Sequence, residues 1–180
     1  MPAAEVLSPI LRRATEADWA DIWPVWHEIV AAGETVAYDP ESDSETSKRS
    51  WFGGADEVWV ATGAVATDAV ASDAEPTGLL GTYKLGANRP GAGSHVATAT
   101  YLVGAAARGR GVGRAMVLHC LQRATEAGYR GIQFNAVVAT NRYAVKLYED
   151  LGFAVVGRVP GAFRSAEHGY VDLLIMYRDL

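Results

Sequence analysis

The stretch that decides the fold reads Tyr101-Leu-Val-Gly-Ala-Ala-Ala-Arg-Gly-Arg-Gly-Val-Gly-Arg114. Apolar residues up to Val103 predict a strand, and the apolar spacing that begins at Val112 predicts a helix directly after a short glycine-rich loop. Glycines let the backbone approach a ligand closely, and the first N–H groups of a helix have no partner inside it. Together with the helix dipole, these groups predict a binding site for a pyrophosphate.

The spacing of the glycines excludes two common phosphate-binding motifs. A dinucleotide fingerprint needs a glycine three residues after its second glycine, but Arg114 follows Gly111 at that position and Met116 follows Gly113. A P-loop needs Gly-Lys-Ser or Gly-Lys-Thr, and neither occurs in the chain. The pattern that remains is Arg-x-x-Gly-x-Gly, whose arginines add positive charge beside the same anion.

A second informative segment reads Asn141-Arg-Tyr-Ala-Val-Lys-Leu-Tyr-Glu-Asp-Leu-Gly-Phe153. It predicts a helix that Asn141 caps and Gly152 ends. Tyr148 follows Asn141 by two helical turns, so both side chains are expected on one face of this helix.

Both segments resemble motifs of the GNAT acetyltransferases, in the same order along the chain. The resemblance implies that the first loop binds the pyrophosphate of coenzyme A and that the preceding strand pairs with the pantetheine arm. It places Leu102 and Val103 on the arm, and Asn141 beside the same cofactor. Tyr148 then donates a proton to the departing thiolate. The pyrophosphate is assigned to Arg108, Gly109, Arg110, Gly111, Val112, Gly113 and Arg114.

The implied activity is N-acetylation, in which a free amine attacks the acetyl group of acetyl-CoA directly. Finer similarities to the yeast enzymes that acetylate proline analogues and to phosphinothricin-type acetyltransferases imply a small, amino-acid-like acceptor. They give Asn135, expected on a buried strand facing the same way as Gln133 and Val137, a role in substrate binding and catalysis. The general base stays open between Glu34, His95 and water.

The predicted fold is α/β (α+β), a mixed central sheet of about seven strands with helices on both faces. Residues 1–9 are expected to form a flexible leader and residues 10–180 a single domain, with a turn at 64–76. Strands are expected at 10–14, 57–61, 79–85, 97–103, 132–138, 153–159 and 170–176. Helices are expected between Thr15 and Gly33 and at 44–52, 111–127 and 141–151.

Composition narrows the range of partners. The net charge of −5 and the pI near 5.3 argue against nucleic acid and anionic membrane as partners. No long apolar segment and no secretory signal is recognisable, so a cytoplasmic protein is expected. A single cysteine excludes a cysteine-built zinc site, and no metal is expected.

The family resemblance also allows a homodimer. A protein or peptide acetyltransferase and a non-catalytic acyl-CoA-binding module remain as alternatives.

Overall fold

The computed structural model describes residues 7–63 and 78–180, so most of the expected leader and the turn at 64–76 lie outside the described residues. The strands are β1 (Ile10–Arg13), β2 (Glu57–Thr62), β3 (Leu79–Ala87), β4 (Val96–Val103), β5 (Gly131–Val138), β6 (Ala154–Ser165) and β7 (Gly169–Asp179). The helices are α1 (Trp19–Ala31), α2 (Ser44–Phe52), α3 (Val112–Glu126) and α4 (Arg142–Asp150), with short 3-10 turns at Glu16–Asp18, Gly91–Gly93 and Ala105–Ala107.

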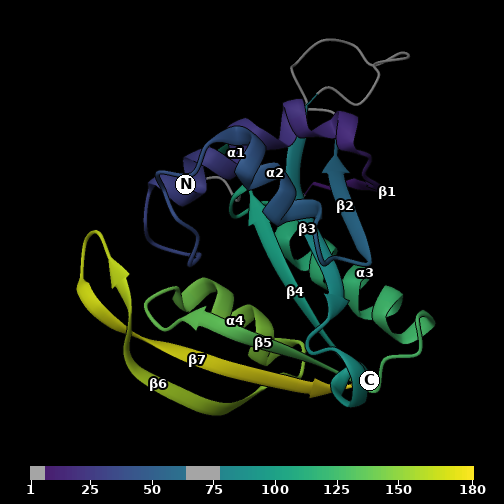
Figure 1. The fold of residues 1–180 in the computed structure, drawn as a ribbon, viewed down its shortest axis with the longest axis vertical. Coiled ribbons are helices and arrows are strands. Elements are labelled where there is room, and N and C mark those ends of the chain that lie inside the picture. Colours follow the sequence, from purple (N-terminus) through teal and green to yellow (C-terminus); the bar gives the residue numbers. More distant parts are fainter. Residues whose placement is uncertain (1–6, 64–77) are drawn as a thin grey trace.

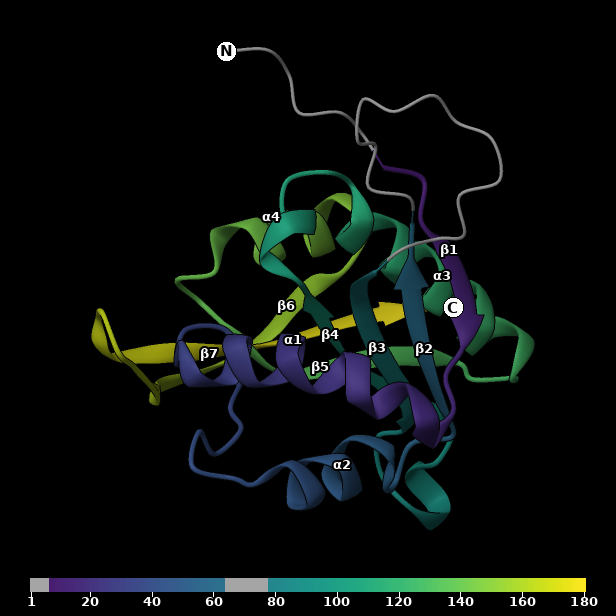
Figure 2. The same ribbon diagram turned by 90° about the horizontal axis from the view of Figure 1, so that it is seen from above.

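The seven strands form one mixed sheet in the order β1-β2-β3-β4-β5-β7-β6. All neighbours are antiparallel except β4 and β5, which run parallel. Helices α1 and α2 pack on one face with an aromatic-rich core, whereas α3 and α4 pack on the other face (Figures 1 and 2). The predicted α/β class, the seven-stranded mixed sheet and the helices on both faces are therefore confirmed.

Local sequence accounts for where the helices begin and end. The Asp43 carboxylate accepts a hydrogen bond from the Thr46 N–H at 2.8 Å and so caps α2. Gly128 and Gly152 follow α3 and α4 with φ of 82° and 85°, a left-handed conformation that glycine adopts without strain. Pro24 lies inside α1 without ending it.

The last two strands are longer than their sequence predicts. The expected end of β6 at residue 159 precedes Pro160 and Gly161, which normally interrupt a strand. Instead β6 continues to Ser165, because a register shift between Val159 and Phe163 accommodates both residues on this edge strand.

Leu7 falls within the expected leader, yet it packs against the core and its N–H donates to the Arg110 carbonyl at 2.9 Å.

None of the helices in residues 7–63 and 78–180 is long and apolar enough to cross a membrane.

Strands β4 and β5 separate soon after they begin (Figure 1). Their parallel pairing is limited to Val96 with Gly131 and Ala97 with Ile132, although β4 continues to Val103 and β5 to Val138. Beyond Ala97, β4 is hydrogen-bonded to β3 only. We call the opening between β4 (residues 98–103) and β5 the splay.

Candidate active site

The glycine-rich loop leads into α3 as its sequence predicts. Gly109 and Gly111 have φ of 73° and 84°, so both use backbone conformations that residues with a Cβ rarely adopt. Gly111 is the N-cap of α3 and provides no side-chain cap, and the first helical bond runs from the Ala115 N–H to the Gly111 carbonyl at 3.0 Å. The N–H groups of Val112, Gly113 and Arg114 thus form an uncapped helix start.

The arginines of the loop differ in their surroundings. Arg108 Nη2 lies 3.7 Å from Glu28 Oε1, and both side chains are exposed. Arg114 is exposed and has no carboxylate within 4 Å in the described part of the chain. Of these two arginines, Arg114 is the one without a paired acid among the described residues, and it lies in the first turn of α3.

Backbone alternation determines which groups of β4 face the splay. The Gly104 N–H donates to the Leu80 carbonyl and the Asn88 N–H donates to the Val96 carbonyl, so even-numbered positions of β4 bond to β3. The N–H and C=O groups of Ala99, Tyr101 and Val103 consequently face the splay without a strand partner. Leu102 bonds toward β3 and buries its side chain under α1, so the geometry favours Val103 over Leu102 for contacts with an extended ligand.

The three predicted elements meet at the mouth of the splay. A Cβ placed on Gly113 would lie 3.6 Å from Val103 Cγ2 and 3.8 Å from Leu147 Cδ2, which puts the start of α3 between the end of β4 and α4. Asn141 caps α4 as predicted, since its Oδ1 accepts from the Ala144 N–H at 3.2 Å. Among the described residues its Nδ2 has no protein partner.

Tyr148 lies on the inner side of α4, beside the splay. Its ring centroid is 4.6 Å from that of Phe134 on β5 and 6.3 Å from that of Tyr101 on β4. Burial raises the pKa of the Tyr148 phenol above its usual value, so the hydroxyl keeps its proton at neutral pH. That hydroxyl has no hydrogen-bond partner within residues 7–63 and 78–180, which leaves its proton available to a ligand.

An uncapped helix start, an open strand edge and a protonated tyrosine lie together at the mouth of the splay. A model of the Acetyltransferase (GNAT) family matches residues 19–153, which contain all three features. The chain belongs to this family.

Individual GNAT proteins share the fold over nearly the whole chain. The GCN5-related N-acetyltransferase from Kribbella flavida is 46% identical, with 96% of this chain and 98% of that chain covered and a TM-score of 0.84. The phosphinothricin acetyltransferase from Sinorhizobium meliloti, whose structure is a complex with acetyl-CoA, is 22% identical, with 97% of this chain and 89% of that chain covered and a TM-score of 0.77. At that identity the likeness concerns the fold alone.

A curated relative matches over a shorter range. The N-acetyltransferase aca1 of Schizosaccharomyces pombe is 37% identical over 98 residues, which cover 54% of this chain and 47% of that protein. The chain thus spans about half the length of this relative. The predicted GNAT membership is confirmed, whereas the finer similarity to proline-analogue enzymes stays a prediction.

Asn135 differs from its predicted environment. It is exposed rather than buried, because β5 bulges between Phe134 and Val137 and leaves Asn135 and Ala136 opposite a single residue of β7. The bulge also turns Val137 to the same face as Phe134, so the predicted alternation is wrong for Val137. It holds for Gln133, whose Nε2 donates to Asn135 Oδ1 at 2.8 Å.

Asn135 nevertheless belongs to a polar group at the root of the splay. Its Nδ2 donates to Asn88 Oδ1 at 2.6 Å and lies 3.4 Å from Thr98 Oγ1. Thr98 shares its face of β4 with Leu102, which packs under α1, so this group opens toward α1 and α2. The asparagine therefore lies on the face of the sheet opposite α3 and α4.

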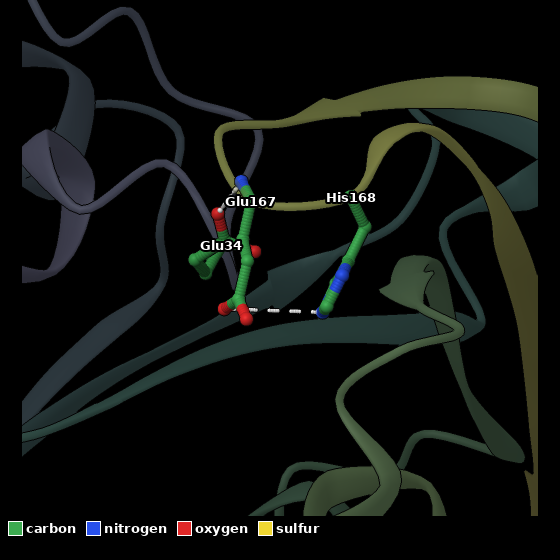
Figure 3. A group of neighbouring side chains, drawn as sticks. All are labelled: Glu34, Glu167 and His168. Carbon is green, nitrogen blue, oxygen red and sulfur yellow. Dashed lines mark hydrogen bonds and ion pairs between the residues drawn. The ribbon is translucent and has the colours of Figure 1, made fainter.

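Glu34 belongs to the loop that follows α1 and lies against the tip of the β6–β7 hairpin (Figure 3). Its carboxylate accepts hydrogen bonds from the Ser165 hydroxyl at 2.6 Å and from the Glu167 N–H at 2.8 Å. Glu34, Glu167 and His168 place ligand-type atoms within 4.8 Å of one another. The hydrogen bonds to Glu34 hold the first two together, and the His168 N–H donates to the same Ser165 hydroxyl at 2.9 Å. The hydrogen bond from Ser165, followed by that from Glu167, lowers the pKa of Glu34, which weakens it as a base.

His95 is also distant from the proposed cofactor loop. It is exposed in the turn before β4, and its carbonyl accepts from the Arg130 N–H at 2.9 Å. It precedes the paired start of β4, whereas the glycine-rich loop follows the other end of the strand. The arrangement brings Tyr148, Asn141, Val103 and the loop together, and leaves Glu34 and His95 outside that group.

We expect Glu34→Gln to destabilise the protein rather than to change the chemical step. Because its folded-state pKa is lowered, Glu34 stabilises the fold above its unfolded pKa and loses this contribution as the pH falls through the folded value. The Tm difference between variant and wild type should therefore be present at pH 7, shrink as the pH falls below the ordinary glutamate pKa of about 4.3, and disappear below the lowered folded-state pKa. Thermal unfolding across this range measures it. Loss of the ascending limb of the kcat pH profile in the variant would instead identify Glu34 as the base.

Ala99 and Tyr101 also present backbone groups to the splay, although the sequence predicts neither of them for the cofactor arm. Backbone groups are common to all residue types, so the sequence carries no signal for this feature. The direction of those groups depends on the register between β3 and β4, which only the structure provides.

Proposed function

We propose that the chain is an acetyl-CoA-dependent N-acetyltransferase that acts on a small amine. The observation that carries the proposal is the open edge of β4, which ends beside an uncapped helix start and faces a protonated tyrosine. Acetyl-CoA offers a matching set of groups, namely a pyrophosphate, an amide-bearing arm and a thioester. The bound acetyl-CoA of the Sinorhizobium meliloti structure supports the same choice of cosubstrate.

The residues present fit such a cosubstrate. The N–H groups of Val112, Gly113 and Arg114 would hold the pyrophosphate, with the loop from Arg108 to Gly111 following its outline. The backbone of Val103, Tyr101 and Ala99 would pair with the amides of the pantetheine arm, as an added strand does. The free Nδ2 of Asn141 would donate to a carbonyl of that arm.

Groups of the chain itself would then assist two parts of the reaction. A backbone N–H of β4 in the splay would donate to the thioester oxygen, where negative charge develops during attack by the amine. Tyr148 would give its phenolic proton to the leaving sulfur, while the proton lost by the attacking nitrogen would pass to water, from which the phenolate would be reprotonated. Orientation of the two reactants by the site supplies much of the rate, about 7–11 kcal/mol in well-oriented reactions.

The hydrogen bonds at Glu34 favour a small acceptor over a protein or peptide. Ser165 and Glu167 at the hairpin tip are hydrogen-bonded to the loop that follows α1, so two elements that border the α1–α2 face are joined. An extended peptide needs an open passage on this face. The polar group at Asn88, Thr98 and Asn135 is the proposed place for the acceptor.

A panel assay tests the proposed function. Purified protein is mixed with acetyl-CoA and individual primary and secondary amines, and both free CoA thiol and acetylated amine are quantified. We expect at least one small amine to yield equal amounts of the two products. Binding of acetyl-CoA without transfer to any small amine would contradict the proposal and favour a non-catalytic acyl-CoA-binding module. Transfer only to peptides would favour the protein acetyltransferase.

A further inference from the structure

Lys84 of β3 lies on the α1–α2 face of the sheet, one strand away from the splay. Its ammonium is 5.3 Å from the ring centroid of Trp51 and 5.6 Å from that of Tyr38, and it donates to the Ser50 carbonyl at 2.9 Å. The two rings and the carbonyl fix the position of a side chain that would otherwise move freely. The side chain of this half-buried residue is thus held in place before any ligand arrives.

No anion balances this charge within the described residues. No carboxylate of residues 7–63 and 78–180 lies within 4 Å of Lys84 Nζ, whereas Lys48 and Lys146 each pair with an acid. An ammonium without a paired acid gains free energy when a carboxylate approaches.

The position of Lys84 relative to the splay sets the size of such a ligand. Lys84 is paired with Thr100 of β4, and Thr100 is adjacent to Tyr101, whose backbone faces the splay. Neighbouring strands are about 4.8 Å apart. A molecule that bears its carboxylate and its amine a few bonds apart can therefore contact Lys84 and still present the amine at the splay.

We propose that Lys84 binds the carboxylate of the acceptor, which makes the substrate class free amino acids and compounds with the same pairing of amine and carboxylate. This inference rests on the proposed N-acetyltransferase function and adds the chemical class of the acceptor. Lys84 is a specificity-determining residue in this account, and its ammonium does not take part in proton transfer. The Asn88–Asn135–Thr98 group borders the same acceptor on the other side.

The test compares matched acceptors and matched variants. Each L-amino acid that the enzyme acetylates is assayed beside its carboxamide, which keeps the amine and removes the negative charge. The variant Lys84→Gln keeps a donor for the Ser50 carbonyl and loses the charge, and Lys84→Met removes both. Lys48→Met, a lysine on α2 that pairs with Glu16, is the control. Thermal unfolding shows which variants are folded.

We expect both Lys84 variants to lower kcat/KM for amino acids by about 10- to 100-fold, the effect of one charge-assisted hydrogen bond. For the carboxamides kcat/KM should change less than about 3-fold, and Lys48→Met should change neither. Equal losses on both acceptor types, or no loss on either, would overturn the role of Lys84. If the wild-type enzyme acetylates amines that lack a carboxylate with the same kcat/KM as amino acids, the proposed substrate class is wrong, although the N-acetyltransferase function is retained. Failure to acetylate any amine would contradict that function itself.

Discussion

Tyr148→Phe is expected to lower kcat by about 100-fold or more, the usual effect of removing a general acid. The substitution keeps the ring and its contacts with Phe134 and Tyr101, and removes only the hydroxyl. Since that hydroxyl has no protein partner in the described part of the chain, the Tm should stay close to that of the wild type. The dissociation constant for acetyl-CoA should also change little. Steady-state kinetics with an accepted amine, together with calorimetric binding of acetyl-CoA, measure both quantities.

Tyr143→Phe is the matched control, because Tyr143 lies on the same helix and the residue is 92% exposed. It should retain wild-type turnover. Slow product release can hide a change in the chemical step, so single-turnover rates are compared as well. A Tyr148→Phe enzyme with a wild-type single-turnover rate would reduce Tyr148 to a packing residue.

Arg114→Glu should separate ligand binding from stability. Arg114 occupies the third position of α3, where a carboxylate interacts favourably with the helix dipole, so the Tm should remain equal or rise. The same reversal of charge opposes a pyrophosphate at the helix start. We expect the Kd for acetyl-CoA to rise by about 100-fold at low salt, and the difference to shrink as the ionic strength increases. Calorimetry at two salt concentrations measures the effect.

Arg130→Glu makes the same change of charge beyond the other end of α3, where Arg130 is exposed. It should leave acetyl-CoA affinity near the wild-type value. Similar losses in the two variants would mean that net charge alone weakens binding. Unchanged affinity in Arg114→Glu would move the pyrophosphate away from this helix start.

Local signals account for most of what the sequence predicts correctly. Gly109 and Gly111 favour a tight turn into a helix, because both adopt a positive φ. Asn141 and Gly152 likewise set the two ends of α4 through short-range hydrogen bonds and backbone conformation. Such features depend on a few adjacent residues, so a single sequence is sufficient to recognise them.

Features that depend on distant pairing could not be predicted in the same way. The bulge that exposes Asn135 arises from the register between β5 and β7, and the hydrogen bonds of Glu34 join residues 131 and 133 positions apart. The direction of the Val103 and Leu102 backbone groups follows from pairing with β3. Residue type carries little information about any of these contacts, because each forms only after separate segments have packed together.

The measurement that tests the central claim most directly is amide exchange, followed residue by residue by NMR with and without acetyl-CoA. Without ligand, the amides of Ala99, Tyr101 and Val103 should exchange faster than those of Thr98, Thr100 and Leu102, which bond to β3. Acetyl-CoA should protect Tyr101 or Val103 and the amides of residues 112–114. Protection that appears elsewhere, with these amides unchanged, would contradict the placement of acetyl-CoA in the splay.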